Sequence, residues 1–167
     1  SRGVGFRHIG KHPFGTDETV TYLQFAAWCV DALFPGTAPI VIGDLSRDGG
    51  GRLPPHRSHR SGRDVDIGFY KEGNEGLRWF QTLESGDMDL EKTWTFIEAL
   101  LRTKSVQYIF VDRSIQEDLY RYARKDGWGD ETLDAVFQYP GGRKETVIRH
   151  VRGHRNHLHV RFYCPPE

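Results

Sequence analysis

Histidine and aspartate side chains gather in two short segments of this 167-residue chain. The first runs from Ser58 to Ile67 and places a histidine seven residues before an aspartate; the second runs from Gly153 to Arg161. Because neutral imidazole is the commonest protein ligand for metal ions, two such clusters far apart in the sequence predict one metal site that folding closes. Six of the eight histidines lie in or beside these segments: His56, His59, His150, His154, His157 and His159.

The alternation of side chains along a strand indicates which of these histidines and aspartates can act together. His157 and His159 fall in a predicted strand, where alternate residues face the same side, so both imidazoles reach one site. A ring nitrogen that binds a metal cannot also accept a proton, so one ligand and one proton-transfer group are expected. With His59 and Asp66, the ligand set becomes two histidines and one carboxylate, which leaves a fourth position for water, as in hydrolytic zinc centres. Spacing alone does not decide which histidine is the ligand. Asp64, on the same strand face as Asp66, is expected to orient a ligand.

Short helices and strands that do not strictly alternate must position these side chains. Helical spacing of apolar residues, with caps at Thr16/Asp17 and Ser114, predicts helices at 16–34, 75–84, 89–103 and 114–125, and a short helix or turn at 130–137. Apolar and alternating stretches predict strands at 39–45, 64–69, 106–111, 146–151 and 157–163. Residues 46–61 are expected to be a loop. This order predicts an α+β fold with a central, mainly antiparallel sheet flanked by helices and a zinc site in a cleft on the sheet.

Length and composition narrow the class of protein. The size predicts a single globular domain over residues 1–167, with 1–16 as a lead-in segment. The 23 Lys and Arg residues balance 23 Asp and Glu residues, which argues against a nucleic-acid binder. No apolar run approaches the ~20 residues of a membrane span. Two cysteines, Cys29 and Cys164, are too few for a zinc site built on thiolates, and whether they pair stays open, as does the oligomeric state.

The two clusters together carry a resemblance to a known family. The pattern Ser-His-x-x-Gly-x-Asp-Val-Asp at residues 58–66, followed by His-x-x-His-x-His at 154–159, resembles the penicillin-insensitive murein endopeptidases. These belong to a wider group of zinc peptidases that includes lysostaphin, D-Ala-D-Ala carboxypeptidase and the hedgehog domain. The resemblance covers most of the chain from about residue 40 onward. One departure is the cysteine content, because that family usually carries more cysteines in disulfides.

The resemblance implies a role for each residue of the two clusters. It implies that one zinc ion per chain is bound by His59, Asp66 and His159. His157 would be the catalytic base or transition-state stabiliser, and His154 would line the cleft and take part in catalysis, where it could polarise the scissile carbonyl.

Substrate contacts are expected from the first cluster and its loop. His56 would line the cleft and hold substrate. Arg57, Arg60 and Arg63 could meet carboxylates on a peptide, and Arg63 is the candidate for substrate binding. The resemblance implies that the substrate is the stem peptide of bacterial peptidoglycan, cut at D,D crosslinks of the D-alanyl to meso-diaminopimelate type. A periplasmic or secreted location is therefore expected.

Three other functions fit the same residues. The site could trim free peptide ends as a D,D-carboxypeptidase or dipeptidase. It could also belong to a zinc-containing wall-binding module without catalysis. A metal-dependent nuclease is the third, and the balanced charge disfavours it. The absence of His-Glu-x-x-His excludes a thermolysin-type helix site.

Overall fold

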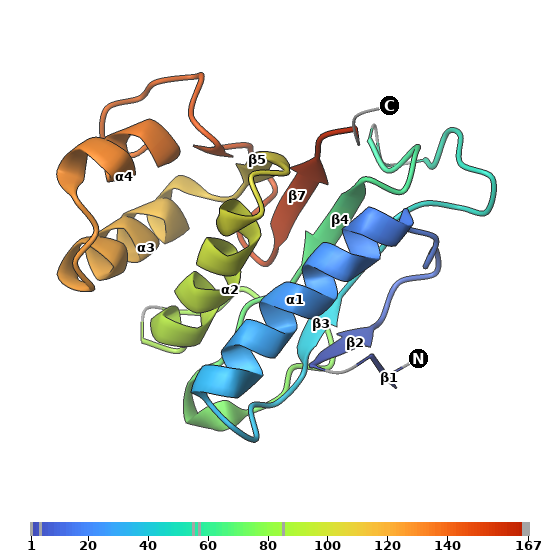
Figure 1. The fold of residues 1–167 in the computed structure, drawn as a ribbon, viewed down its shortest axis with the longest axis horizontal. Coiled ribbons are helices and arrows are strands. Elements are labelled where there is room, and N and C mark those ends of the chain that lie inside the picture. Colours follow the sequence, from blue (N-terminus) through green and yellow to red (C-terminus); the bar gives the residue numbers. More distant parts are fainter. Residues whose placement is uncertain (1, 4, 55, 57, 85, 165–167) are drawn as a thin grey trace.

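A single mixed sheet organises the chain (Figure 1). The computed structural model describes residues 2–3, 5–54, 56, 58–84 and 86–164. Within them, seven strands join in the order β1-β2-β3-β4-β7-β5-β6. Four of the six pairings are antiparallel, and β2–β3 and β5–β6 are parallel. The predicted α+β class with a mainly antiparallel sheet is thus confirmed. The strands are β1 (Arg2–Gly3), β2 (Phe6–His8), β3 (Ile40–Ile42), β4 (Asp64–Ile67), β5 (Val106–Phe110), β6 (Ile148–Arg149) and β7 (Leu158–Phe162).

Two long helices cover one face of this sheet. In Figure 1, α1 (Asp17–Leu33) and α2 (Leu90–Arg102) lie side by side in front of the central strands. The other helices, α3 (Arg113–Lys125) and α4 (Asp130–Val136), pack together near β5 and β6. Val65 and Ile67 of β4 belong to the apolar core beneath α1 and α2. Since side chains alternate along a strand, Asp64 and Asp66 face away from those helices, toward the uncovered side.

Most predicted helices are present, with one correction to a cap. Helix α1 begins after Thr16, whose side-chain oxygen accepts a hydrogen bond from the Thr19 backbone N–H at 3.2 Å, as the sequence predicted. Helix α3 begins one residue earlier than expected, and its cap is Asp112 rather than Ser114. The Asp112 carboxylate accepts bonds from both the backbone N–H and the hydroxyl of Ser114, at 3.0 and 2.8 Å. An ionised carboxylate is the stronger acceptor of the two candidate caps.

The helix predicted over 75–84 is wrong. Residues 75–84 contain no helix, and a short 3-10 turn, η1 (Glu72–Asn74), precedes them. Gly76 sits tightly against Ala38, where a Cβ would approach the alanine methyl to 3.3 Å, and glycine costs a helix interior about 0.5–1 kcal/mol. Leu77 and Phe80 then pack in different places, the first in a buried position and the second in the functional cleft. Tertiary packing thus overrides a helical spacing of apolar residues.

The lead-in segment forms part of the sheet. Strands β1 and β2 pair with each other, and β2 runs parallel to β3, with the Ile9 N–H donating to the Ile42 carbonyl at 2.8 Å. Strands of two or three residues are too short to produce a recognisable period, so the sequence predicted only an irregular lead-in. The Asp44 carboxylate accepts the backbone N–H groups of Lys11 and His12 at 2.8 and 2.9 Å. These bonds make the lead-in one wall of the functional cleft.

Two further observations concern the cysteines and the helices. Cys29 is half-buried and Cys164 exposed, and both are free thiols. None of the helices in the part of the chain that the structure describes combines the length and the apolar character needed to span a bilayer.

Candidate metal centre

Strands β4 and β7 bring the two sequence clusters together. They pair antiparallel, with Asp66 opposite His159 and Asp64 opposite Arg161. Directly opposite side chains on one face of such a pair have Cβ atoms about 4.5–5.5 Å apart, so each carboxylate meets its partner across the strands. The paired strands therefore build a polar surface on the side of the sheet away from α1 and α2.

The loop before β4 adds His59 to this surface. Its backbone lies in the left-handed region at φ 55°, which is uncommon for a residue with a side chain. The neighbouring Arg60 carbonyl accepts a hydrogen bond from the Gly51 N–H at 2.8 Å and holds the loop. The His59 ring is fully buried, and its Nδ1–H donates to the Leu45 carbonyl at 2.9 Å. That bond fixes the tautomer and leaves the Nε2 lone pair facing the strands.

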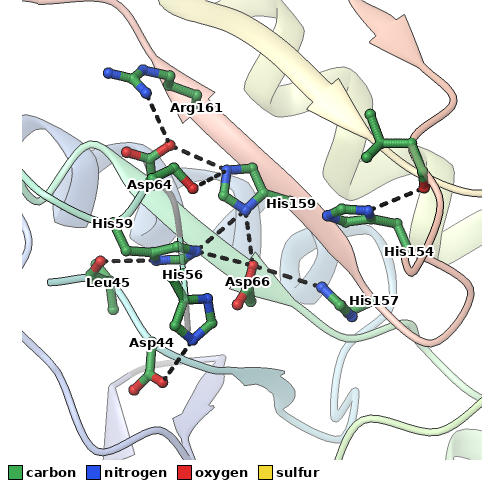
Figure 2. Close-up of polar contacts among 12 residues, drawn as sticks. Asp44, Leu45, His56, His59, Asp64, Asp66, His154, His157, His159 and Arg161 are labelled. Carbon is green, nitrogen blue, oxygen red and sulfur yellow. Dashed lines mark hydrogen bonds and ion pairs between the residues drawn. The ribbon is translucent and has the colours of Figure 1, made fainter. Parts of the chain in front are cut away.

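Three donor atoms converge at the centre of Figure 2. His159 Nδ1 lies 3.0 Å from Asp66 Oδ1, His59 Nε2 lies 3.3 Å from the same oxygen, and the two nitrogens are 3.2 Å apart. On the far side of its ring, His159 Nε2 donates to Asp64 Oδ1 at 3.1 Å. All four side chains are buried. Both histidines are thus anchored at one nitrogen and present the other to a shared point.

A second set of donors overlaps the first. His56, His59 and Asp66 each offer one ligand atom, and these atoms lie within 4.8 Å of one another. His56 is half-buried, and its Nε2 lies 3.6 Å from Asp44 Oδ2. Figure 2 places its ring between His59 and Asp44. The cluster therefore contains two possible ligand sets that share His59 and Asp66.

The electrostatics of the cluster suit a cation. Burial alone would lower the pKa of His159, but its hydrogen bonds to Asp64 and Asp66 raise that pKa to about 9. Burial works to raise the pKa of Asp66, yet hydrogen bonds with His159 and His59 hold it well below its usual range. The pKa of Asp64 is also lowered, since its bond to His159 and the charge of Arg161 outweigh its burial. Two carboxylates thus stay ionised and hold positive charge between them.

His157 lies beside the three donors, and its pKa is shifted in the opposite direction from that of His159. Its Nδ1–H donates to Asn156 Oδ1 at 2.7 Å, which leaves Nε2 as an acceptor 3.7 Å from Asp66 Oδ1. The Phe80 ring stacks on the imidazole, with centroids 5.0 Å apart and planes inclined by 20°. Burial lowers the pKa of His157 to about 4, against the attraction of Asp66. His157 is therefore neutral near pH 7, with an unprotonated nitrogen directed at the site.

His154 completes the group of histidines. Its Nδ1–H donates to the Val151 carbonyl at 3.1 Å, and its ring lies 5.0 Å from that of His157. Burial lowers the pKa of His154 as well. Its remaining nitrogen, Nε2, is again an acceptor at neutral pH.

These groups open into a cleft of about 1050 Å³ along the sheet. Of the residues singled out in the sequence, His56, Asp66, His154, His157 and His159 line it, and His59 lies buried behind them. Sequence reasoning missed several lining residues, among them Asp44, Phe80, Tyr108, Phe110 and Arg161. The two-residue period of β5 and β7 could have identified the last three, since Tyr108 and Phe110 alternate on one strand and Arg161 follows His159 on the other. No comparable pattern marks Phe80, which sits in an irregular segment.

The predicted substrate-binding arginine lies elsewhere. Arg63 is not part of the cleft lining; its Nε donates to Ser61 Oγ at 3.2 Å and its Nη1 to the Phe162 carbonyl at 3.3 Å. Arg60 lines a separate, smaller depression, and Arg57 lies outside the described residues. His150 is also outside the cleft, where its Nδ1 accepts the Arg113 N–H at 3.0 Å.

The chain is similar to known proteins over nearly its whole length. The family model of penicillin-insensitive murein endopeptidases matches residues 4–167. The chain is similar to the penicillin-insensitive murein endopeptidase of Haemophilus influenzae, with 27% identity over 99% of this chain and 58% of the relative. It is 29% identical to proteins of the same name from Escherichia coli O1:K1 and Shigella boydii serotype 18, over 92% of this chain and 55% of each relative. The chain thus spans a little over half the length of these curated relatives.

Proposed function

The chain belongs to the penicillin-insensitive murein endopeptidase family, and from that premise we propose that it is a zinc peptidase of the bacterial cell wall. Its reaction would be hydrolysis of D,D crosslinks, of the D-alanyl to meso-diaminopimelate type, between peptidoglycan stem peptides. The observation that carries the proposal is the triangle of His59, Asp66 and His159 donors beside a neutral His157 in an open cleft. Because peptidoglycan lies outside the cytoplasm, the proposed place of action is the periplasm or the cell exterior.

The donor chemistry fits one zinc ion. Zinc bonds of about 2.0–2.2 Å in tetrahedral geometry place neighbouring donor atoms about 3.3–3.6 Å apart. The three donor separations are 3.0, 3.2 and 3.3 Å, so the side chains need to move apart by only a few tenths of an ångström to reach this spacing. Two imidazoles and one carboxylate are a common ligand set of catalytic zinc sites, with the fourth position open to water or substrate.

Between the two overlapping ligand sets, the one containing His159 is favoured. Its donor atoms are already close together, whereas the set with His56 is looser, within 4.8 Å. The ring of His159 is also anchored by the Asp64 carboxylate, the kind of partner that orients metal-bound histidines in proteins. His56 meets Asp44 at 3.6 Å and is half-exposed, which suits a group at the cleft wall that contacts substrate.

The chain's own residues then handle the proton. Bound zinc would supply Lewis acidity, polarising the scissile carbonyl and lowering the pKa of a water molecule to about 7. His157 would accept the proton of the attacking water at Nε2 and pass it to the leaving amine. Asn156 holds the opposite nitrogen protonated, and Phe80 limits the rotation of the ring and shields it from water.

His154 is better placed to hold substrate than to polarise its carbonyl. Because Nδ1–H donates to the Val151 carbonyl, neutral His154 has no proton on Nε2 to offer an oxygen. Its Nε2 can accept a hydrogen bond from a substrate N–H. We assign His154 the role of binding substrate in the cleft, while the neighbouring His157 transfers the proton.

The test of the function is an analysis of products from two substrates. Purified, zinc-loaded protein is incubated with crosslinked muropeptide dimers and with linear pentapeptides, and the products are identified by mass. Conversion of dimers to monomers, blocked by a chelator and restored by zinc, is the expected result. Cleavage of the pentapeptides alone would show a D,D-carboxypeptidase instead, and binding to cell-wall sacculi without any product would show a wall-binding module.

Zinc binding is expected to release protons. The pKa of His159 is about 9 in the metal-free protein, because its bonds to Asp64 and Asp66 outweigh burial, so a metal ion must displace a proton below that pH. Apparent affinity should therefore rise about tenfold per pH unit between pH 7 and 9 and level off above. Zinc titration calorimetry at pH 7.5, in buffers of different protonation enthalpy, should detect at least one proton released per ion. Binding without proton release would remove His159 from the ligand set.

A further inference from the structure

Arg161 occupies a distinctive place on the central strand of the site. It follows His159 by two residues on β7, so these two side chains leave the strand on the same face. His157 lies one residue before the strand begins, and it lines the same cleft. Two residues of a strand advance the chain by about 6.6 Å. Figure 2 shows the consequence, with His159 between His157 on one side and Arg161 on the other. The guanidinium therefore lies beside the His159–Asp64 pair, with Nη1 3.6 Å from the same Asp64 Oδ1 that lies 3.1 Å from His159 Nε2.

Contacts hold the Arg161 side chain in place but leave some of its N–H groups without a hydrogen-bond partner among the described residues. It pairs across the strands with Asp64 on β4 and Tyr108 on β5. Its Nη1 lies 3.6 Å from Asp64 Oδ1 and 3.5 Å from the Tyr108 hydroxyl. Among the residues that the structure describes, Nε and Nη2 make no hydrogen bond or ion pair, and 27% of the side chain is exposed. A planar guanidinium with free N–H groups is suited to bind a carboxylate.

The charge around the cleft gives a carboxylate one place to bind. Within the described lining, Arg161 is the only lysine or arginine. Asp44 lies on the opposite side of the donor triangle, beside His56. An anionic group of the substrate is thus repelled at the Asp44 end and attracted at the Arg161 end.

We propose that Arg161, with the Tyr108 hydroxyl beside it, binds a substrate carboxylate next to the scissile bond and so orients the peptide across the cleft. The inference rests on the proposed function and adds the chemical group that the cleft selects. Two carboxylates of a crosslinked stem peptide offer this chemistry, the free one on diaminopimelate and the one at the terminal D-alanine. An amide or neutral side chain in that position would lose the contact.

Binding of stem peptides tests the proposal without turnover. The probes are a stem tetrapeptide ending in D-alanine and two versions, each with one of these two carboxylates amidated. Their Kd values are measured by calorimetry with the zinc-loaded wild type, Arg161→Gln and Arg161→Lys, and Arg63→Gln as matched control outside the cleft. Amidation of the recognised carboxylate should weaken wild-type binding about 10- to 100-fold, the range for a hydrogen bond to a charged group.

The two amidated peptides separate the possible sources of the carboxylate. For Arg161→Gln, the same amidation should change Kd less than about twofold, and Arg161→Lys should recover part of the effect. Arg63→Gln should behave like the wild type. Equal weakening of all peptides by Arg161→Gln would show that the residue acts only through Asp64, and wild-type binding unaffected by either amidation would overturn the proposal. Because this readout needs no hydrolysis, it is independent of the dimer digestion that tests the function itself.

Discussion

Replacing His159 by alanine is expected to remove both zinc binding and hydrolysis, whereas His157→Ala should keep zinc and lose activity. His159 Nδ1 lies 3.0 and 3.2 Å from the other two proposed donors, so its loss leaves only two ligands. His157 Nε2 is 3.7 Å from Asp66 and belongs to a neutral ring that is placed to move protons. Removal of a general base typically costs about 10²–10⁴-fold in kcat.

Zinc content and kcat, measured on the same samples, separate the two roles. His150→Ala is the matched control, because His150 lies outside the cleft and contacts the Arg113 backbone instead. It should retain both zinc and activity. Equal loss of zinc in His157→Ala and His159→Ala would overturn this division of roles.

Asp64→Asn is expected to weaken zinc binding about 10- to 100-fold, the usual effect of losing a partner of a metal ligand. The Asp64 carboxylate is almost fully buried and accepts the Nε2–H of His159 at 3.1 Å, which keeps the Nδ1 lone pair available for the metal. An amide has nearly the same shape but no charge, and it can present its NH₂ group to the ring. That orientation would favour a proton on Nδ1, where the metal should bind.

Competition with a chelator of known affinity measures this change. Asp48→Asn, in an exposed position outside the cleft, provides the control and should leave zinc affinity unchanged. An Asp64→Asn protein with wild-type zinc affinity would show that the carboxylate serves only Arg161. Thermal unfolding of both variants without metal checks that the fold is intact.

The parts of the site that lie on strands could be predicted because a strand has a fixed two-residue period. Asp64 and Asp66 share a face of β4 for that reason, and His159 of β7 contacts both carboxylates. His157 precedes β7 by one residue, and its Nε2 still lies 3.7 Å from Asp66. The pairing of Asp66 with His159 could not be predicted, since strand register depends on the packing of the whole sheet.

Other features depend on contacts that the sequence does not display. Phe80 reaches His157 from an irregular segment whose apolar spacing suggested a helix, and the ring also fills the space above Gly43, where a Cβ would meet it at 2.7 Å. The Asp44 carboxylate joins the lead-in to the cleft by accepting the backbone N–H groups of Lys11 and His12, and such bonds leave no pattern of residue types. The loop arginines show that a charge near a motif does not by itself fix a place in the cleft, because Arg63 bonds to Ser61 and to the Phe162 carbonyl instead.

The most direct test of the central claim is the location of the metal in crystals of zinc-loaded protein, from anomalous scattering at the zinc edge. We predict one strong peak with bonds of about 2.0–2.2 Å to His59 Nε2, Asp66 Oδ1 and His159 Nδ1. His157 should remain unbound, with Nε2 facing the metal's open side. A metal bound by His56, His59 and Asp66 with His159 left unbound would contradict the account.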